Sequence, residues 1–150
     1  MLHVLAAIAI SGIVPFDMAG QKPRDLAKLD ACKILTSADL AAATKRRVIR
    51  SAGGEVHCTY VLEAPQGGAD TYDFFLLEAS MVQALLSVNT PAQKGTPVPG
   101  LWSEAYVGPA VGSKQLRLIA LQKGDMGIEI QGPNKDVLIA LGKLAASRLK

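Results

Sequence analysis

Few side chains of this sequence combine the types and spacing that catalysis or metal binding requires. After residue 20 there are two cysteines, Cys32 and Cys58, and one histidine, His57. A cysteine–histidine nucleophile needs the two side chains to meet, but neighbours on a strand point to opposite faces. Zinc sites need about four ligands at short paired spacings, and there is no Cys-x-x-Cys pair. The sequence therefore predicts no catalytic residue, no metal and no cofactor.

The carboxylates leave a second kind of chemistry open. No nucleophile elbow, phosphate-binding loop, dinucleotide fingerprint, zinc-protease helix or calcium loop is present. A hydrolase that uses two carboxylates stays an alternative, since such acids need no local motif. Most of the acids fall where helix caps and turns are expected: Asp30, Asp39, Asp70, Asp73, Glu104, Asp125 and Asp136.

Trp102 is the side chain best suited to bind a ligand or partner. It is the only tryptophan and follows the segment 89–101, which holds three prolines and two glycines. Glu104 and Tyr106 come shortly after it. Long loops in compact domains are often functional, and exposed tryptophan and tyrosine contribute strongly to interfaces. We predict a binding surface of Trp102, Glu104 and Tyr106; the alternative is that Trp102 plugs the core beneath the loop.

Four basic residues lie within six positions: Lys45, Arg46, Arg47 and Arg50. Such a cluster could form a patch that contacts an anionic partner, for instance a lipid surface or a wall polymer. The alternative is a solvated helix end, where cations are favoured by the helix dipole. No aromatic residue interrupts the cluster as base stacking would require, so nucleic acid is not expected.

The N-terminus differs in character from the rest of the chain. Residues 2–16 contain no charged side chain, and all 16 basic residues follow Gly20. An apolar stretch of this length, with small residues at 19 and 20, is typical of an export signal, whereas a membrane-spanning helix needs about 20 apolar residues. We expect a signal peptide over residues 1–20 and one domain over 21–150, periplasmic or secreted. A retained anchor and a buried N-terminal element remain alternatives.

Export also changes how the two cysteines are interpreted. In an oxidising compartment the pair indicates one disulfide that closes a loop of 27 residues; in cytosol it would indicate free thiols or a metal. Residues 21–150 carry 16 basic and 12 acidic side chains, a formal net charge of +4. With 49% apolar residues and 5% aromatic residues, the chain predicts a globular domain with an aliphatic core and excludes extended disorder. We expect a monomer or a weak oligomer.

Hydrophobic periodicity predicts an α+β domain. Helices are expected after the N-cap residues Thr36, Ser80 and Asn134. Alternating and apolar runs predict an antiparallel sheet of about five strands packed against these helices. The expected strands lie at residues 55–63, 71–79, 104–107, 115–121 and 126–131.

Several short segments resemble a family of small exported bacterial proteins of unknown function, which includes many actinobacterial cell-envelope lipoproteins. These segments are residues 30–40, which match a D-x-C-x-L-L-T start, together with residues 57–60, 97–106 and 123–125. The resemblance covers about residues 30–149 and implies a PsbP-like fold and a disulfide between Cys32 and Cys58. The sequence departs from the family at Trp102-Ser103, where Gly-Asp is preferred, and lacks a lipidation cysteine at the signal.

Together these features predict an exported, non-enzymatic domain that binds an envelope protein or a small ligand. Two alternatives stay open. One is an envelope hydrolase that uses carboxylates, and the other is a structural subunit anchored by an uncleaved N-terminal helix.

Overall fold

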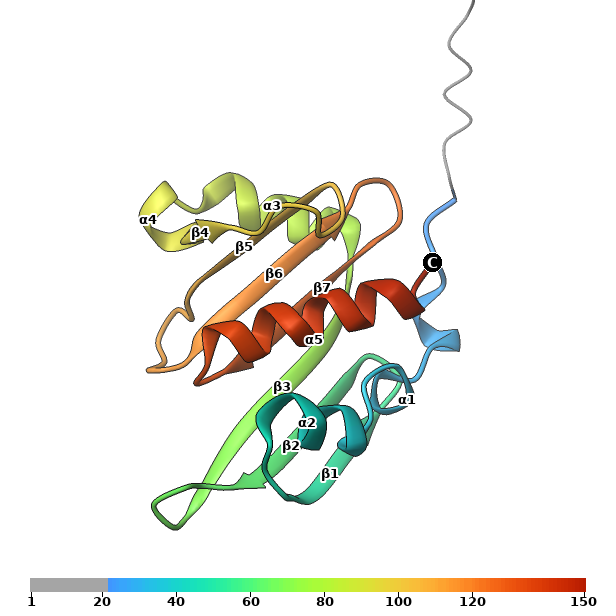
Figure 1. Cartoon of the computed structure of the whole chain (residues 1–150). Helices are drawn as coiled ribbons and strands as arrows, with labels where there is room; N and C mark the ends of the chain where they lie inside the picture. Colours follow the sequence, from blue (N-terminus) through green and yellow to red (C-terminus); the bar gives the residue numbers. More distant parts are fainter. Residues whose placement is uncertain (1–21) are drawn as a thin grey trace, which may run out of the picture.

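A computed structural model of the chain describes residues 22–150 (Figure 1). The expected signal peptide at residues 1–20 lies outside this range. Among the described residues, no helix is both long and apolar enough to cross a membrane.

All strands belong to one antiparallel sheet with the order β1-β2-β3-β7-β6-β5-β4. The sheet therefore consists of two sequential halves, which meet where β3 pairs with β7. The strands are β1 (Val48–Gly54), β2 (His57–Glu63), β3 (Ala69–Glu78), β4 (Thr96–Pro97), β5 (Glu104–Pro109), β6 (Leu116–Gln122) and β7 (Met126–Gly132).

Helices cover the sheet unequally on its two faces (Figure 1). One face carries α1 (Ala31–Ile34), α2 (Ser37–Thr44) and α5 (Lys135–Arg148), which pack on the main core. The opposite face carries α3 (Ala79–Val88), which contacts β3, β6 and β7. A single 3₁₀ turn (Leu26–Lys28) precedes α1, and the short α4 (Pro91–Lys94) lies beside β5.

Strand alternation explains how this arrangement produces two apolar clusters. Along β6, Leu118 and Ala120 face the main core under α5, whereas Ile119 and Leu121 face Val82 of α3. Successive strand residues point to opposite faces, so a strand covered on both sides reads as a continuous apolar run. The run in β6 has this origin.

The predicted starts of two helices are confirmed. Thr36 and Asp39 form a reciprocal capping box at the start of α2, and the Asn134 side chain accepts from the backbone N–H groups of Asp136 and Val137 at the start of α5. Each bond satisfies a backbone donor that has no partner within the helix. The predicted cap at Ser80 is wrong, because α3 begins at Ala79 with Glu78 as an N-cap that makes no side-chain bond.

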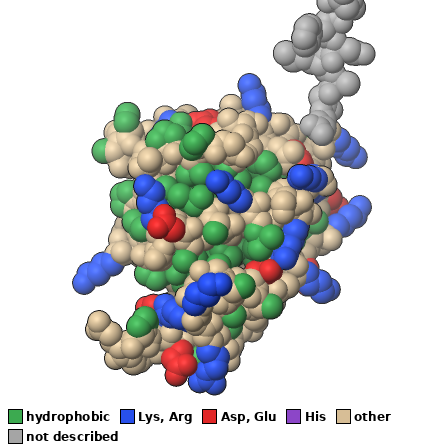
Figure 2. Space-filling model, in the orientation of Figure 1, with side chains coloured by type: hydrophobic (Ala, Val, Ile, Leu, Met, Phe, Trp, Pro, Cys, Tyr) green, Lys and Arg blue, Asp and Glu red, His purple; other side chains and the backbone are tan. Residues whose placement is uncertain are grey.

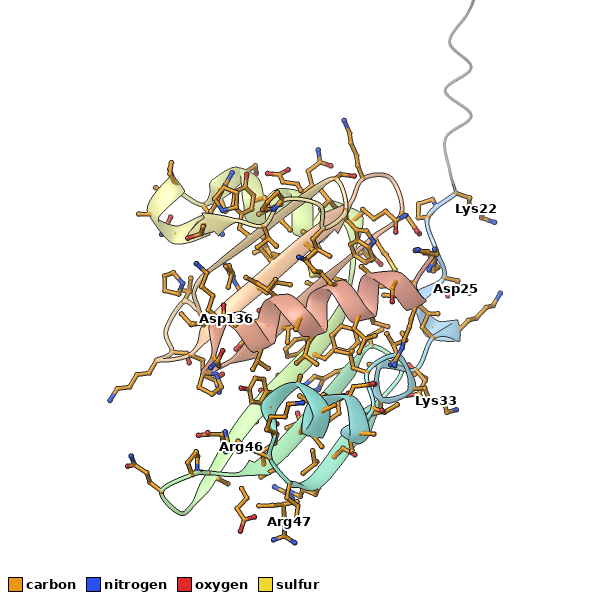
Figure 3. The ribbon with its side chains drawn as sticks, viewed as in Figure 1. Lys22, Asp25, Lys33, Arg46, Arg47 and Asp136 are labelled. Carbon is orange, nitrogen blue, oxygen red and sulfur yellow. A yellow bond between two sulfur atoms is a disulfide. The ribbon has the colours of Figure 1, made fainter. Side chains whose placement is uncertain are left out.

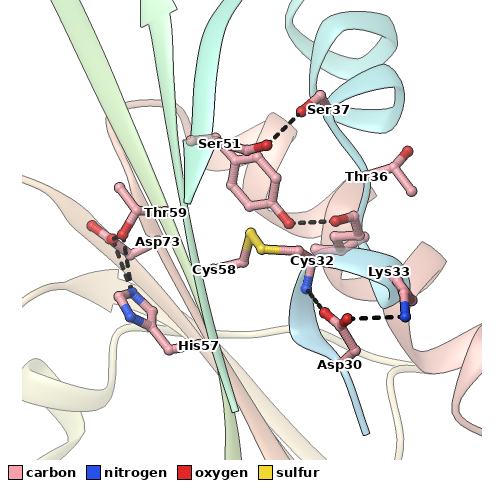
Figure 4. The surroundings of a disulfide bond; sticks show 12 residues. Asp30, Cys32, Lys33, Thr36, Ser37, Ser51, His57, Cys58, Thr59 and Asp73 are labelled. Carbon is pink, nitrogen blue, oxygen red and sulfur yellow. Dashed lines mark hydrogen bonds and ion pairs between the residues drawn. A yellow bond between two sulfur atoms is a disulfide. The ribbon is translucent and has the colours of Figure 1, made fainter. Parts of the chain in front are cut away.

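The cysteine pair forms the predicted disulfide, which connects α1 to β2. The Cα atoms of Cys32 and Cys58 lie 5.1 Å apart, and Asp30 caps α1 by accepting from the Cys32 backbone N–H at 3.0 Å. Nearby, the Tyr60 hydroxyl donates to the Leu35 carbonyl, and burial raises the pKa of Tyr60. The crosslink and this bond hold the α1–α2 segment on the sheet (Figure 4).

The sheet has seven strands, and the expectation of about five is corrected accordingly. The prediction omitted β1 and β4. Nearly all of β1 is exposed, so it lacks the alternation that marks a half-buried strand. The pairing of β1 with β2 also shifts register between Val48 and Arg50. Because β4 has only two residues, it is too short to show any periodicity.

An ion pair between α2 and α5 leads to a pH-dependent prediction. Arg148 donates to both carboxylate oxygens of Asp39, at 2.6 and 2.9 Å, and mainly for this reason the pKa of Asp39 falls from 3.8 to about 2. A carboxyl pKa that is lower in the folded state stabilises the fold above the unfolded pKa, and this contribution is lost as the pH falls through the folded pKa.

We therefore expect Arg148→Ala to lower the free energy of unfolding by about 1–2 kcal/mol at pH 6, after allowance for the partial exposure of Arg148. The deficit relative to the unsubstituted protein should shrink between pH 4 and pH 2. Part of it should persist, because Arg148 also donates to the Ile34 carbonyl. Urea unfolding at pH 6, 4 and 2.5 measures the effect; a deficit that does not change with pH would contradict it.

Candidate functional site

A groove at one end of the sheet contains Trp102. It lies between the turn that leads into β5 and the last two turns of α5, and it has a volume of about 540 Å³. The Trp102 ring is partly exposed and packs on the main core from this position. The groove is lined by Pro99, Gly100, Leu101, Trp102, Gln122, Lys143, Ala146, Ser147 and Lys150.

The turn that carries Trp102 has an unusual backbone. Trp102 has a φ of +52°, a left-handed conformation that costs energy for any residue with a Cβ atom. Two bonds to β6 hold the turn in place: the Ser103 N–H donates to the Leu121 carbonyl at 3.0 Å, and the Lys123 N–H donates to Ser103 Oγ at 3.1 Å. The indole is therefore fixed at the groove.

The groove is electropositive and contains an unused acceptor. Lys143 and Lys150 are exposed at its rim, and no aspartate or glutamate side chain lines it. The Oε1 atom of Gln122 is buried and makes no hydrogen bond to any residue in the range 22–150. A buried polar atom without a partner is costly, so it marks a position where a bound donor would be stabilised.

Trp102, Glu104 and Tyr106 line one smaller hollow of about 230 Å³ along the turn into β5 and the start of that strand. The Tyr106 hydroxyl donates to Glu104 Oε1 at 3.0 Å, which raises the pKa of Tyr106. The Tyr106 ring packs against the α3 cluster on the opposite face of the sheet from the main core, with Lys94 Nζ 5.4 Å from the ring centroid. The structure thus brings the three predicted residues to one hollow, and Trp102 alone of the three also lines the groove beside α5.

The basic cluster lies at the other end of the sheet, beside the β2–β3 turn (Figure 3). Arg46 Nη1 is 2.7 Å from Asp70 Oδ2, and Arg47 Nε is 3.3 Å from Glu63 Oε2. Lys45 is the C-cap of α2, and the last turn of this helix holds no basic residue, so the helix-end interpretation applies to Lys45 alone. Two of the four cations thus have carboxylate partners, which reduces the charge available to an anionic partner.

A small polar cluster occupies the face of the sheet opposite the disulfide (Figure 4). Thr59 Oγ1 donates to Asp73 Oδ1 at 2.6 Å, and His57 Nε2 lies 3.2 Å from the same oxygen. The His57 ring stacks on Phe75 with centroids 4.3 Å apart. Cys58 is buried on the other face, so it cannot meet His57. The hollow beside His57 is open and is lined by residues 53–57, none of which is Thr59 or Asp73.

The structure also bears on metal binding and on catalysis by carboxylates. Within residues 22–150 no three or more histidine, cysteine, aspartate or glutamate side chains gather in a way that could hold a metal ion. The bonds from Arg148 lower the pKa of Asp39. A general acid in a carboxylate mechanism needs a raised pKa, so the Asp39–Arg148 pair is interpreted as a stabilising contact between α2 and α5.

No protein-family model, curated protein or solved structure matches the chain. The function proposed for the chain therefore rests on the groove at Trp102 and on the charges around it.

Sequence reasoning found Trp102 but missed Gln122, Lys143 and Lys150. Lys143 and Lys150 are seven residues apart in the closing helix and its end, a spacing that places them on one helical side. That spacing is the feature of the sequence that predicts a shared surface for the two lysines. Nothing in the sequence indicates that this side of the helix meets the Trp102 turn, because the contact depends on how α5 lies across the sheet.

Proposed function

We propose that this chain is an exported, non-enzymatic binding domain whose groove at Trp102 takes a small anionic molecule with a flat apolar part. The observation that carries the proposal is the composition of one groove: an indole ring, two lysines and a buried amide oxygen without a partner, with no aspartate or glutamate among the lining residues. Binding sites typically combine apolar surface with a few placed polar groups.

Each part of the ligand corresponds to one feature of the groove. A flat apolar group would stack on Trp102 beside Pro99. A carboxylate, sulfonate or phosphate would lie near the ammonium groups of Lys143 and Lys150, where charge-assisted hydrogen bonds are stronger than neutral ones. A donor on the ligand would satisfy Gln122 Oε1 once a shift of this side chain exposes the atom, which is buried in the structure.

Export is part of the same proposal. A disulfide is consistent with an oxidising compartment outside the cytosol. The uncharged run at residues 2–16 supports an export signal. The PsbP-like relationship stays a prediction that rests on the short segments that resemble the family.

The lone tryptophan gives a direct test. In a ¹⁵N-labelled sample the only indole N–H signal belongs to Trp102, and Trp102→Phe confirms its assignment by removing it. We expect 2-naphthoate to shift this signal in a saturable way, and the neutral analogue 2-naphthalenemethanol to bind at least tenfold more weakly. Equal shifts from both compounds, or none from either at millimolar concentration, would contradict an anion-binding groove.

A matched pair of variants locates the charge effect. Lys143→Gln with Lys150→Gln should weaken 2-naphthoate about tenfold, equivalent to ~1.4 kcal/mol. Lys114→Gln with Lys135→Gln changes the net charge equally but lies outside the groove lining, and it should leave the affinity within twofold. Equal losses in both double variants would mean that net charge, and not the groove, binds the probe.

A further inference from the structure

The end of the domain at which the described chain begins carries a group of exposed lysines. We propose that this end docks on the surface of an anionic lipid bilayer. The surface, called the lysine end below, consists of Lys22, Lys123, Lys143, Lys150 and the adjacent Trp102. It includes the rim of the groove but extends beyond it, and the proposal is independent of any small ligand.

One partly buried ion pair holds together three distant parts of the chain at the lysine end. Arg24 Nη2 contacts Asp125 Oδ2 at 2.9 Å, the Arg24 backbone N–H donates to Asp125 Oδ1 at 3.1 Å, and Arg24 Nη1 donates to the Leu149 carbonyl at 2.7 Å. Lys22, Lys123 and Lys150 each lie within two residues of one of these groups. The first described residues, the β6–β7 turn and the end of α5 therefore meet at one end of the molecule (Figure 1).

The positive charge at this end is not neutralised by the nearby acids. Asp125 has only 6% of its side chain exposed and is occupied by Arg24, and Asp25 pairs with Lys28 at 3.4 Å. Glu78, which lines the cavity beside Arg24, is the other carboxylate there. Within residues 22–150 the four lysines have no ion-pair partner, and all four are exposed. Figure 2 shows many blue side chains gathered on this side of the molecule.

Two observations favour a bilayer over a soluble polyanion. While residues 1–20 remain on the chain, any contact of the uncharged run at residues 2–16 with a membrane brings Lys22 and the lysine end to the same membrane. Trp102 also stands at this end, and tryptophan is enriched at membrane–water interfaces. Near a negatively charged bilayer each lysine strengthens binding about fivefold.

The test compares full-length chains on vesicles. Co-sedimentation is measured with vesicles of phosphatidylcholine that contain 0 to 40% phosphatidylglycerol. We expect the bound fraction to rise steeply with phosphatidylglycerol and to fall when salt is raised from 0.05 to 0.5 M, because salt screens exposed charges. Lys22→Gln with Lys123→Gln should weaken partitioning about 30-fold. Neither residue lines the groove, so the double variant should still bind 2-naphthoate.

The control variant is Lys114→Gln with Lys135→Gln, in which both lysines are exposed and lie at the opposite end of the sheet. It removes the same charge and should change vesicle partitioning by less than threefold. Equal losses from the two variants would overturn the proposal, as would partitioning that does not depend on phosphatidylglycerol. Binding to soluble polyphosphate without binding to vesicles would overturn it in favour of a soluble polyanion. If 2-naphthoate fails to bind but these vesicle results hold, only the groove proposal is lost.

Discussion

Reduction of the Cys32–Cys58 disulfide is expected to lower the free energy of unfolding by about 3.5 kcal/mol. The crosslink spans 26 positions. Closing a loop of this length lowers the conformational entropy of the unfolded chain, which raises its free energy by about 3.5 kcal/mol. We expect the packing around α1 and β2 to remain after reduction. The Cys58 side chain stays buried on β2, and the Asp30 side chain caps α1 without the disulfide. For a domain of this size, a loss of 3.5 kcal/mol is a large part of the total stability.

Urea unfolding with and without reductant measures the effect on the same protein. Mass spectrometry confirms the chemical state, because reduction adds two hydrogen atoms, one to each sulfur. Cys32→Ala with Cys58→Ala should reproduce the reduced midpoint and should not respond to reductant. Midpoints that differ by less than the equivalent of 1 kcal/mol would show that the loop between the cysteines stays ordered in the unfolded chain.

Alanine substitutions of the adjacent residues Phe74 and Phe75 are expected to lower the free energy of unfolding by very different amounts. Phe74 is 1% exposed in the main core, whereas Phe75 points to the other face and stacks on His57. We expect Phe74→Ala to cost about 3–5 kcal/mol, because it removes buried surface and leaves a cavity. Phe75→Ala should cost about 1 kcal/mol, the value of a partly exposed ring stack.

These two variants differ by one position and by nothing else in composition, so each is the control for the other. Urea unfolding gives both free energies, and the slope of each transition shows whether the unfolded state has changed. Similar costs for the two variants would contradict the assignment of faces in β3. They would also put in doubt the pairing of Phe74 with Ile130 on β7.

The fold could be predicted wherever burial is one-sided. In β2, Cys58, Tyr60 and Leu62 alternate with more exposed residues, and the Thr36 capping box marks a helix start with local bonds. The strand β1 could not be predicted, because an exposed edge strand gains its order from its neighbour and not from its own side chains. The buried Asp125 in a Lys-Gly-Asp turn reads as an ordinary turn residue until Arg24 is seen beside it.

The site was predictable to a lesser extent than the fold. Trp102 stands out because it is single and follows a loop rich in proline and glycine. Gln122 gives no signal, since its unpaired oxygen results from packing around the end of β6. The lysine end is also invisible in sequence, because its members come from the first described residues, the turn before β5, the β6–β7 turn and the second half of α5 with its end. Charge that is scattered in sequence becomes a surface only after the sheet has formed.

The placement of α5 has a consequence for how the protein is made. This helix is the last element among the described residues, and its residues Leu138, Leu141 and Ala145 belong to the main core. Among the described residues, the guanidinium group of Arg24 donates hydrogen bonds to the Asp125 carboxylate and to the Leu149 carbonyl, both of which follow it by more than 100 positions. The central pairing of β3 with β7 also joins strands far apart in sequence, and such non-local contacts form slowly. A nascent chain therefore cannot complete the main core until α5 has been synthesised.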